Sequence, residues 1–508
     1  MPTLSKSKII AFRQCPKRLW LEVHRPELRQ DSPATQASFQ VGYQVGDIAR
    51  RIYDPFEAGV CIDVTKDGFP AAFKQSARLL AEGARPVFEA GFKSDGTIAF
   101  ADVMIPVVEG ECRSWKMVEV KSSTGVKDYH RDDVAVQSFL ARAMGVNLSS
   151  ACVAHIDSSW IYPGGGDYVG LLVESDLTDE TIERAEEVSS WICGAHQIAD
   201  SNSEPEIATG NQCHTPFECG FCGYCNRDKV PPEFPLDWLP RVTPKQRIAF
   251  KAAGAEDLRD VPEHLLSQKQ RLVRDHTLRN EVFFDREMAK RAIRGSGFPA
   301  YFLDFETSNR PVPIWAGNRP YQQIPFQFSL HKLTDSLLLE HSQFLDLSGN
   351  DPSRSFAEAV IEACDEVGPV FVYNAKFEKR ILREQADRFL DLSAALQEII
   401  NRIIDLLPLA EKCFYAPSQC GSWSIKSVLP AAVPELSYDD LEGVRDGGMA
   451  VNAFAEAIDQ KTTAARKEDL RGQLSEYCKL DTLAMVGLWK CFLGLNKPEI
   501  APPPTSHN

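Results

Sequence analysis

A chain of 508 residues is too long for one ordinary hydrophobic core, so we expect roughly two to four domains. Its 44% hydrophobic and 25% charged residues are typical of a globular protein, and no apolar run is long enough to span a bilayer. The net charge of −15, considered alone, argues against nucleic acid as a partner. The segment Met1–Trp20 lacks an apolar signal region, so we expect a cytoplasmic protein without membrane association.

Residues 1–228 are predicted to form a first mixed α/β domain. The apolar patterns favour strands at Thr97–Pro106, Trp115–Lys121 and Ala151–Ile156, with a helix near Asp132–Met144 between the last two. The two early strands are separated by a hairpin distance, so they are expected to pair.

Charged side chains on these two strands form the first candidate site. Asp102 lies on one strand, and Glu119 and Lys121 share one face of the next because side chains alternate along a strand. Asp102 and Glu119 can hold Mg²⁺ while Lys121 steadies water or phosphate. Gln137 follows on the predicted helix. The plainer interpretation of Glu119 and Lys121 is an ion pair on a surface strand.

Fourteen cysteines require an explanation, because a reducing compartment does not maintain a disulfide framework. Most are isolated and are expected to be small buried residues. Four crowd together late in the first domain, and an early one can join them: Cys15, Cys213, Cys219, Cys222 and Cys225. Thiolates bind iron–sulfur clusters and Zn²⁺, so either metal, or no metal, is compatible with the spacing.

These features together resemble the RecB/Cas4-type PD-(D/E)XK nucleases that carry an iron–sulfur cluster. The resemblance implies a restriction-endonuclease-like fold with a Mg²⁺-dependent nuclease site. It also implies a [4Fe–4S] cluster, with Zn²⁺ as the alternative and Cys222 as a competing ligand, on Cys15, Cys213, Cys219 and Cys225. The family's acid or histidine on the first core helix has no clear counterpart, and Asp47 is the nearest substitute.

Residues 229–295 are predicted to be a linker, Pro-rich at Val230–Pro240, followed by a small helical segment. Two basic runs, one near the N-terminus and one in this segment, offset the negative net charge locally. Each is either a solvated helix face or a patch that binds nucleic acid. They comprise Lys6, Lys8, Arg13, Lys17 and Arg18, and Lys269, Arg271, Arg274, Arg279, Arg286, Lys290, Arg291 and Arg294.

Residues 296–495 are predicted to form a second α/β domain, followed by a disordered tail at 496–508. The patterns favour strands and helices in the order strand Ala300–Phe305, strand Phe326–Leu330, helix Ser353–Val367, strand Val370–Tyr373 and helix Leu474–Trp489. Gly368 and Pro369 are expected to end the first of these helices.

Acidic residues of this domain form the second candidate site. Asp304 and Glu306 point to one side of a buried strand, where their repulsion favours a divalent cation between them. Glu378 follows Asn374 onto the first turns of a helix, and Tyr477 and Asp481 share a helix face because they are four residues apart. The plainer interpretation is a strand end whose acids reach solvent.

The order and spacing resemble the DEDD exonucleases of the ribonuclease H-like fold, in the subgroup with a tyrosine, although that family usually has Asp in place of Glu378. The resemblance implies two-metal hydrolysis with Mg²⁺ or Mn²⁺. Asp304 would bridge both ions, Glu306 and Asp481 would hold one, Glu378 would help the other, and Tyr477 would orient water.

The two domains, joined by a helical linker, also resemble a family of bacterial proteins labelled only as a domain of unknown function. The expected function is a 3′→5′ exonuclease that acts on DNA, with a second nuclease site in the first domain. The alternatives are an exonuclease that trims RNA and a catalytically inactive scaffold that binds nucleic acid.

Overall fold

The computed structural model describes residues 2–495 except 111 and 366, so the predicted tail 496–508 lies outside the described residues. The chain divides into two compact units, both mixed α/β. The first unit is Met1–Val230 with Arg310–Gln322, and the second is Pro231–Asn309 with Gln323–Asn508. Among the described residues, no helix has both the length and the apolar character needed to cross a membrane.

The first unit is built on a seven-stranded sheet in the order β2-β3-β4-β5-β6-β7, with β1 paired to β4. Strands β3, β4 and β5 form an antiparallel meander, which includes the predicted pairing of the two early strands. Strand β6 runs parallel to β5 because helix α6 forms the crossover between them. The strands are β1 (Leu4–Ser5), β2 (Val60–Cys61), β3 (Val87–Ser94), β4 (Thr97–Glu109), β5 (Cys112–Lys121), β6 (Leu148–Ile156) and β7 (Leu172–Asp176).

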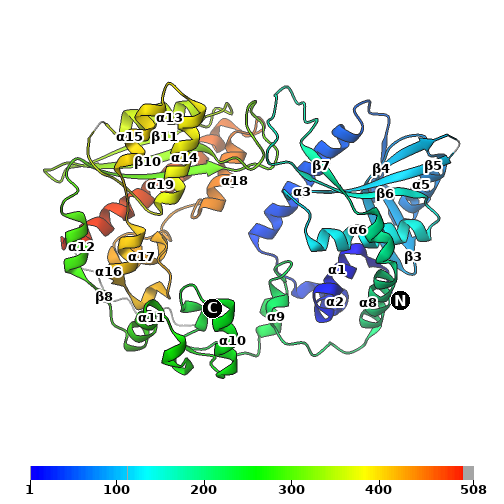
Figure 1. Ribbon diagram of the computed structural model, residues 1–508, viewed down its shortest axis with the longest axis horizontal. Helices are drawn as coiled ribbons and strands as arrows, with labels where there is room; N and C mark the ends of the chain where they lie inside the picture. The colour runs from blue at the N-terminus through cyan, green and yellow to red at the C-terminus, as the bar shows by residue number, and fades with distance from the viewer. Residues whose placement is uncertain (1, 111, 366, 496–508) are drawn as a thin grey trace. The chain divides into compact units, whose positions relative to one another are not determined.

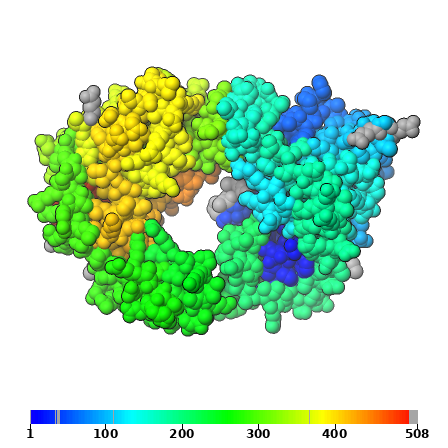
Figure 2. All heavy atoms as spheres, in the orientation of Figure 1, coloured from blue at the N-terminus to red at the C-terminus, as the bar shows by residue number. Residues whose placement is uncertain are grey.

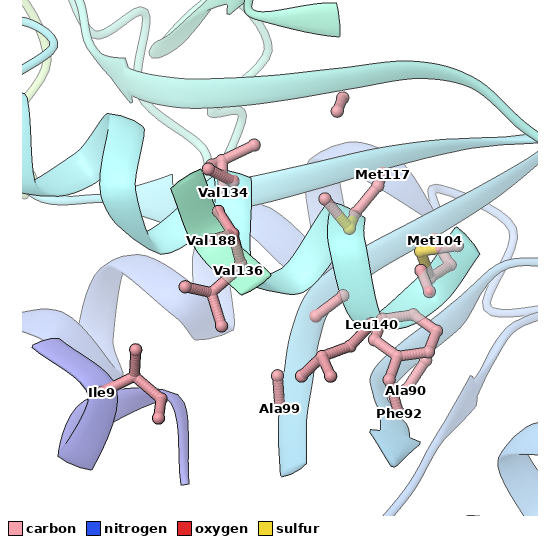
Figure 3. Close-up of a cluster of buried hydrophobic side chains, with 14 of the residues drawn as sticks. Ile9, Ala90, Phe92, Ala99, Met104, Met117, Val134, Val136, Leu140 and Val188 are labelled. Carbon is pink, nitrogen blue, oxygen red and sulfur yellow. The ribbon is translucent and has the colours of Figure 1, made fainter. Parts of the chain in front are cut away.

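Helices cover both faces of this sheet (Figure 1). On one face α6, α5, α1 and α8 enclose the main core, part of which Figure 3 shows between Met117, Leu140 and Val188. Helix α3 packs on the other face. The helices are α1 (Lys6–Gln14), α2 (Pro16–His24), α3 (Pro33–Tyr53), α4 (Val64–Asp67), α5 (Phe69–Glu82), α6 (Asp128–Ala143), α7 (Thr178–Glu183), α8 (Ala185–Asp200) and α9 (Cys222–Asn226).

The segment Arg310–Gln322 completes the first unit although it lies between two strands of the second. Val312 is buried against Val45, Ile48 and Ile156, and the Tyr321 hydroxyl donates a hydrogen bond to the carbonyl of Ser122. The sequence predicts this whole segment within 296–495, because no local pattern distinguishes it from a loop.

The second unit is built on a five-stranded sheet in the order β11-β10-β9-β12-β13. Strands β11, β10 and β9 are antiparallel, and β12 and β13 run parallel to β9. The strand that carries the predicted acids is therefore at the centre. The strands are β9 (Ala300–Ser308), β10 (Ile324–Leu333), β11 (Leu339–Leu345), β12 (Val370–Val372) and β13 (Ile403–Asp405).

Side chains alternate along β9 between the two faces of the sheet, so they pack into two separate hydrophobic cores. Leu303 and Phe305 pack under α13, α14 and α15, while Ala300 and Phe302 face α12, α16, α17 and α19. The helices are α12 (Arg286–Ile293), α13 (Ser353–Ala363), α14 (Ala375–Arg388), α15 (Ser393–Arg402), α16 (Leu407–Cys413), α17 (Ile425–Ala432), α18 (Gly447–Ala457) and α19 (Ala464–Leu493).

The end predicted for the helix Ser353–Val367 is wrong. Helix α13 ends at Ala363, because Asp365 adopts a left-handed backbone conformation with φ of 42° that cannot continue the helix. Val367, which the predicted helix included, is 63% exposed.

The segment after residue 230 packs into a small core of its own, in which Leu239, Phe250 and Leu258 are buried. It contains α10 (Pro244–Ala252) and α11 (Gln268–Arg279), with short 3-10 turns around them. The sequence indicated helices only, whereas the two-residue strand β8 (Phe283–Phe284) also pairs with β14 (Phe414–Tyr415).

Candidate active sites

Three predicted acids converge in the second unit. Asp304 and Glu306 leave β9 on the side that faces α19, and α19 carries Asp481. One carboxylate oxygen from each residue lies within 4.8 Å of the other two. Glu306 and Asp481 are buried and Asp304 is partly buried. The prediction that Asp481 faces the pair on β9 is confirmed, and this group can hold a metal ion.

Burial and mutual repulsion set the electrostatics of this group. Burial, and then the charge of Asp481, raises the pKa of Asp304 well above its usual range. Burial followed by the Asp304 charge does the same to the pKa of Glu306, and burial raises the pKa of Asp481 to about 6. Without a cation the three carboxylates therefore resist ionising together.

Glu378 lies on the first turn of α14, as predicted, and lines the same cleft. Its side chain is 2% exposed, and its Oε2 has no hydrogen-bond partner among the described residues. Burial, and then the charge of Asp304, raises the pKa of Glu378 to about 9. Glu378 is not one of the acids that meet within 4.8 Å, so its carboxylate is the outlying member of the set.

The turn before α14 is fixed by Asp405. Asn374 has a left-handed backbone with φ of 81°, and the N–H groups of Asn374 and Ala375 each donate to the Asp405 carboxylate at 3.0 Å. The acid at the end of β13 thus holds the start of α14, and thereby Glu378, in place.

Tyr477 lies one turn before Asp481 on α19, is 4% exposed and lines the cleft. Burial, and then the charges of Asp481 and Glu306, raises the pKa of its hydroxyl. The predicted pairing of Tyr477 and Asp481 on one helix face is confirmed.

Two further residues of this site were not predicted. The Tyr438 hydroxyl donates a hydrogen bond to Oδ1 of Asp481. The Lys426 ammonium lies 5.1 Å from the Tyr438 ring centre and 4.9 Å from that of Tyr477. Lys426 is the second residue of α17, and Tyr438 lies in the irregular stretch that follows. Neither belongs to a periodic pattern that points to the site, so local sequence gives no signal for them.

The cleft around these side chains has a volume of about 230 Å³. Its polar lining is Asp304, Glu306, Tyr373, Asn374, Glu378, Lys426, Tyr477 and Asp481. Every residue predicted for the second site therefore opens onto one cleft.

The predicted residues of the first unit also meet. Glu119 is 3% exposed, and its Oε2 accepts a hydrogen bond from the Gln137 amide at 2.6 Å. Its Oε1 accepts from Lys121 at 2.8 Å and from Lys6 at 2.6 Å. Asp102, on the neighbouring strand, accepts a hydrogen bond from the N–H of Val120 at 2.7 Å. Glu119 therefore has a donor at both oxygens.

The pKa values of Glu119 and Asp102 shift in opposite directions. Although burial raises the pKa of Glu119, Lys121 and Lys6 outweigh it and hold that pKa below its usual range. Burial, and then the charge of Glu119, raises the pKa of Asp102 to about 8. Lys121 also contacts Asp133 on α6 at 2.5 Å.

The residues that the sequence missed here are Lys6 and Glu89. Lys6 comes from the start of α1, and Glu89 occupies the position opposite Asp102 between β3 and β4, with a left-handed φ of 55°. Burial, and then the charge of Glu119, raises the pKa of Glu89. Asp47, the substitute considered for the family's early acid, instead pairs with Arg50 on the surface.

The five cysteines line one small cavity in the first unit, beside Lys17 and Arg18. Helices α1 and α2 lie beside α9 in the ribbon (Figure 1), and dark blue atoms of the N-terminal part border blue-green atoms in the space-filling view (Figure 2). This arrangement brings Cys15 to the late cysteines. Four sulfurs around one zinc ion would lie about 3.8 Å apart, given Zn–S bonds of about 2.3 Å in a tetrahedron. Among the described residues no three cysteine sulfurs lie within 4.8 Å of one another, so the thiols are spread more widely.

Comparison with known proteins gives a family match over part of the chain and no activity. Residues 301–424 match the model of a family described as a domain of unknown function (DUF2779). The match covers β9 with Asp304 and Glu306, and Glu378 on α14, but ends before Tyr477 and Asp481. No curated protein matches the chain.

Proposed function

We propose that the protein is a metal-dependent nuclease whose principal active site is the acidic cleft of the second unit. The observation that carries the proposal is the convergence of Asp304, Glu306 and Asp481 within 4.8 Å in a cleft that Tyr477 and Glu378 also line. Buried carboxylates at this spacing favour a divalent cation, and all-oxygen ligands suit Mg²⁺ or Mn²⁺.

The residues present fit such cations. Asp304, whose charge raises the pKa of both Glu306 and Glu378, would contact two ions. Glu306 and Asp481 would hold one ion, and the unpartnered Oε2 of Glu378 would face the other. Two bound cations clamp a phosphodiester, activate water and stabilise the leaving oxygen. The chain itself excludes bulk water from the acids and presents the Tyr477 hydroxyl, whose raised pKa keeps it protonated, as a donor that orients water.

The proposed reaction is 3′→5′ exonucleolytic hydrolysis of DNA, in a ribonuclease H-like unit of the DEDD type with a tyrosine. The central strand with two acids, the acid after β12 and the Tyr477–Asp481 helix support this assignment.

We propose a second nuclease site, in a PD-(D/E)XK-like first unit, at Asp102, Glu119, Lys121 and Gln137. Its support is the hydrogen-bonded placement of these four residues on β4, β5 and α6. A cation held by Asp102 and Glu119 would have to compete with Lys6 and Lys121 for the Glu119 carboxylate.

We further propose that Cys15, Cys213, Cys219 and Cys225 hold a [4Fe–4S] cluster that ties the N-terminal helices to the end of the first unit. The wide sulfur spacing suits a cluster larger than a single Zn²⁺ ion. Protein purified without oxygen should be brown and contain iron and sulfide in nearly equal amounts. Cys15→Ser should lose the colour, whereas stoichiometric zinc in iron-fed preparations would overturn the cluster alone.

The principal site is tested by Mg²⁺-dependent release of nucleotides from labelled DNA and RNA. Asp304→Ala should abolish release without unfolding the protein, since the variant removes the acid expected to contact both ions. Tyr477→Phe should lower kcat by about 10²–10⁴-fold with little change in the Mg²⁺ requirement. Faster hydrolysis of RNA would identify an RNA-trimming enzyme. No hydrolysis by wild type, with nucleic acid still bound, would indicate an inactive scaffold.

A further inference from the structure

We propose that Lys426 is a substrate-binding residue of the second unit that contacts the phosphate group of the nucleotide at the cleavage site. The inference rests on the proposed function and adds to it the group that recognises the substrate's charge. Among the described residues that line the cleft, Lys426 is the one cationic side chain.

The contacts of Lys426 leave its ammonium group available. Its Nζ donates to the backbone carbonyl of Arg445 at 2.8 Å, and the rings of Tyr438 and Tyr477 flank it. An ammonium has three donors, so two remain for a ligand. Within the described residues no carboxylate lies within 4.0 Å of this ammonium.

The position of Lys426 is therefore fixed by a carbonyl and two aromatic faces rather than by an ion pair. Its charge still reaches the acids, because it lowers the pKa of Asp304, Glu306 and Asp481 against the effect of burial. A lysine whose role was to neutralise these acids would instead lie in direct contact with one of them, as Lys6 does with Glu119.

The charge balance of the cleft supports a phosphate ligand. The carboxylates that line the cleft contribute −4 when all four are ionised, and Lys426 contributes +1. The four are Asp304, Glu306, Glu378 and Asp481. Two divalent cations add +4, so the occupied cleft carries a net charge of +1, which matches one phosphodiester anion. Without Lys426 the occupied cleft would be neutral and would lose a charge-assisted hydrogen bond to the phosphate.

The test is calorimetric titration of the full-length protein with deoxyadenosine 5′-monophosphate, the expected product class, in saturating Mn²⁺. Lys426→Met should raise the Kd of the nucleotide by about 10–100-fold, the usual value of a hydrogen bond to a charged group. Lys426→Arg should retain most of the affinity. Lys461→Met, at an exposed lysine outside the cleft, is the matched control and should bind as wild type does.

A titration of each variant with Mn²⁺ alone separates the two roles open to Lys426. Equal Mn²⁺ affinity in wild type and Lys426→Met, with weaker nucleotide binding only in the variant, supports phosphate contact. Tighter Mn²⁺ binding by Lys426→Met, with unchanged nucleotide affinity, would overturn the proposal. Lys426 would then neutralise the acids in place of a metal ion. If wild type binds neither Mn²⁺ nor nucleotide in a manner sensitive to Asp304→Asn, the proposed function fails together with this inference.

Discussion

The two acidic sites differ in how their charge is balanced. In the first unit, Lys6 and Lys121 contact Glu119 at 2.6 and 2.8 Å. In the second unit, neither Glu306 nor Asp481 has a cationic partner within 4.0 Å among the described residues. In the first site Lys6 and Lys121 neutralise Glu119, whereas the second site requires protons or bound cations.

This difference separates two roles that buried acids can have. Removing Glu119 from the first site leaves the partly buried Lys6 without its carboxylate and Lys121 with Asp133 alone, so Glu119 is structural even without metal. Removing an acid from the second site relieves repulsion in the metal-free protein, so its acids cost stability until a cation binds. The second site is therefore expected to bind metal more tightly, because there a cation displaces protons and no ion pair has to break.

The largest expected effect is on the stability of the first unit. Glu119→Ala should lower its free energy of unfolding by about 3–5 kcal/mol in EDTA, because the partly buried Lys6 ammonium loses its ion pair and Lys121 keeps only the one with Asp133. Since a chain of two units need not unfold in one step, hydrogen exchange of β4 and β5 is the appropriate measurement.

Glu306→Ala is the matched control for that prediction. It removes an equally buried acid from the site without lysine contacts, and should leave metal-free protection in β9 unchanged or slightly raised. An equal loss of hydrogen-exchange protection in Glu119→Ala and Glu306→Ala would contradict the contrast between the two sites.

A smaller effect concerns pH in the absence of metal. The pKa of Glu378 is raised from 4.5 to about 9 in the folded protein, so between these values the folded state binds a proton that the unfolded state has released. Stability should therefore fall as pH rises through this window, by up to about 1.4 kcal/mol per pH unit for this group. Glu378→Gln should remove that slope.

The measurement is denaturant unfolding of wild type and Glu378→Gln in EDTA at several pH values from about 5 to about 8.5. The variant should gain relative stability steadily toward the alkaline end, and excess Mn²⁺ should reduce the difference by stabilising the wild-type carboxylate. Parallel curves for the two proteins would show that Glu378 is not held in its protonated form by burial.

Local periodicity was sufficient to predict the acids of the second site, and Asp102 and Glu119 of the first. Alternation on a strand placed Asp304 with Glu306, and helical spacing placed Tyr477 with Asp481. Glu378 was predicted because it lies where a strand runs through a turn into a helix. The same patterns identified the central strands of both sheets, because a two- or four-residue period is a property of the local sequence.

Residues that join a site from irregular or distant segments could not be found in this way. Lys6 reaches Glu119 across 113 positions of sequence, and Tyr438 reaches Asp481 across 43. The position of Val312 in the core of the first unit likewise depends on how the chain returns after β9. These contacts are products of tertiary packing, and no local period encodes them.

The smallest expected effect concerns Tyr438, a positioning residue that acts on the second site through Asp481. Its hydroxyl holds Oδ1 of that carboxylate, so Tyr438→Phe should leave Asp481 in place but less well oriented. The loss of one hydrogen bond is worth about 1 kcal/mol, which corresponds to roughly a fivefold lower kcat.

The Mn²⁺ dependence of the rate distinguishes Tyr438 from Tyr477, whose hydroxyl is proposed to orient water directly. Because Tyr438 acts through a carboxylate expected to hold a cation, Tyr438→Phe should shift the Mn²⁺ concentration for half-maximal rate upward by a few-fold. Tyr477→Phe should lower the rate far more and leave that concentration nearly unchanged. If Tyr438→Phe alters neither kcat nor the Mn²⁺ requirement, its hydrogen bond does not position Asp481, and the cation site depends on the backbone of α19 alone.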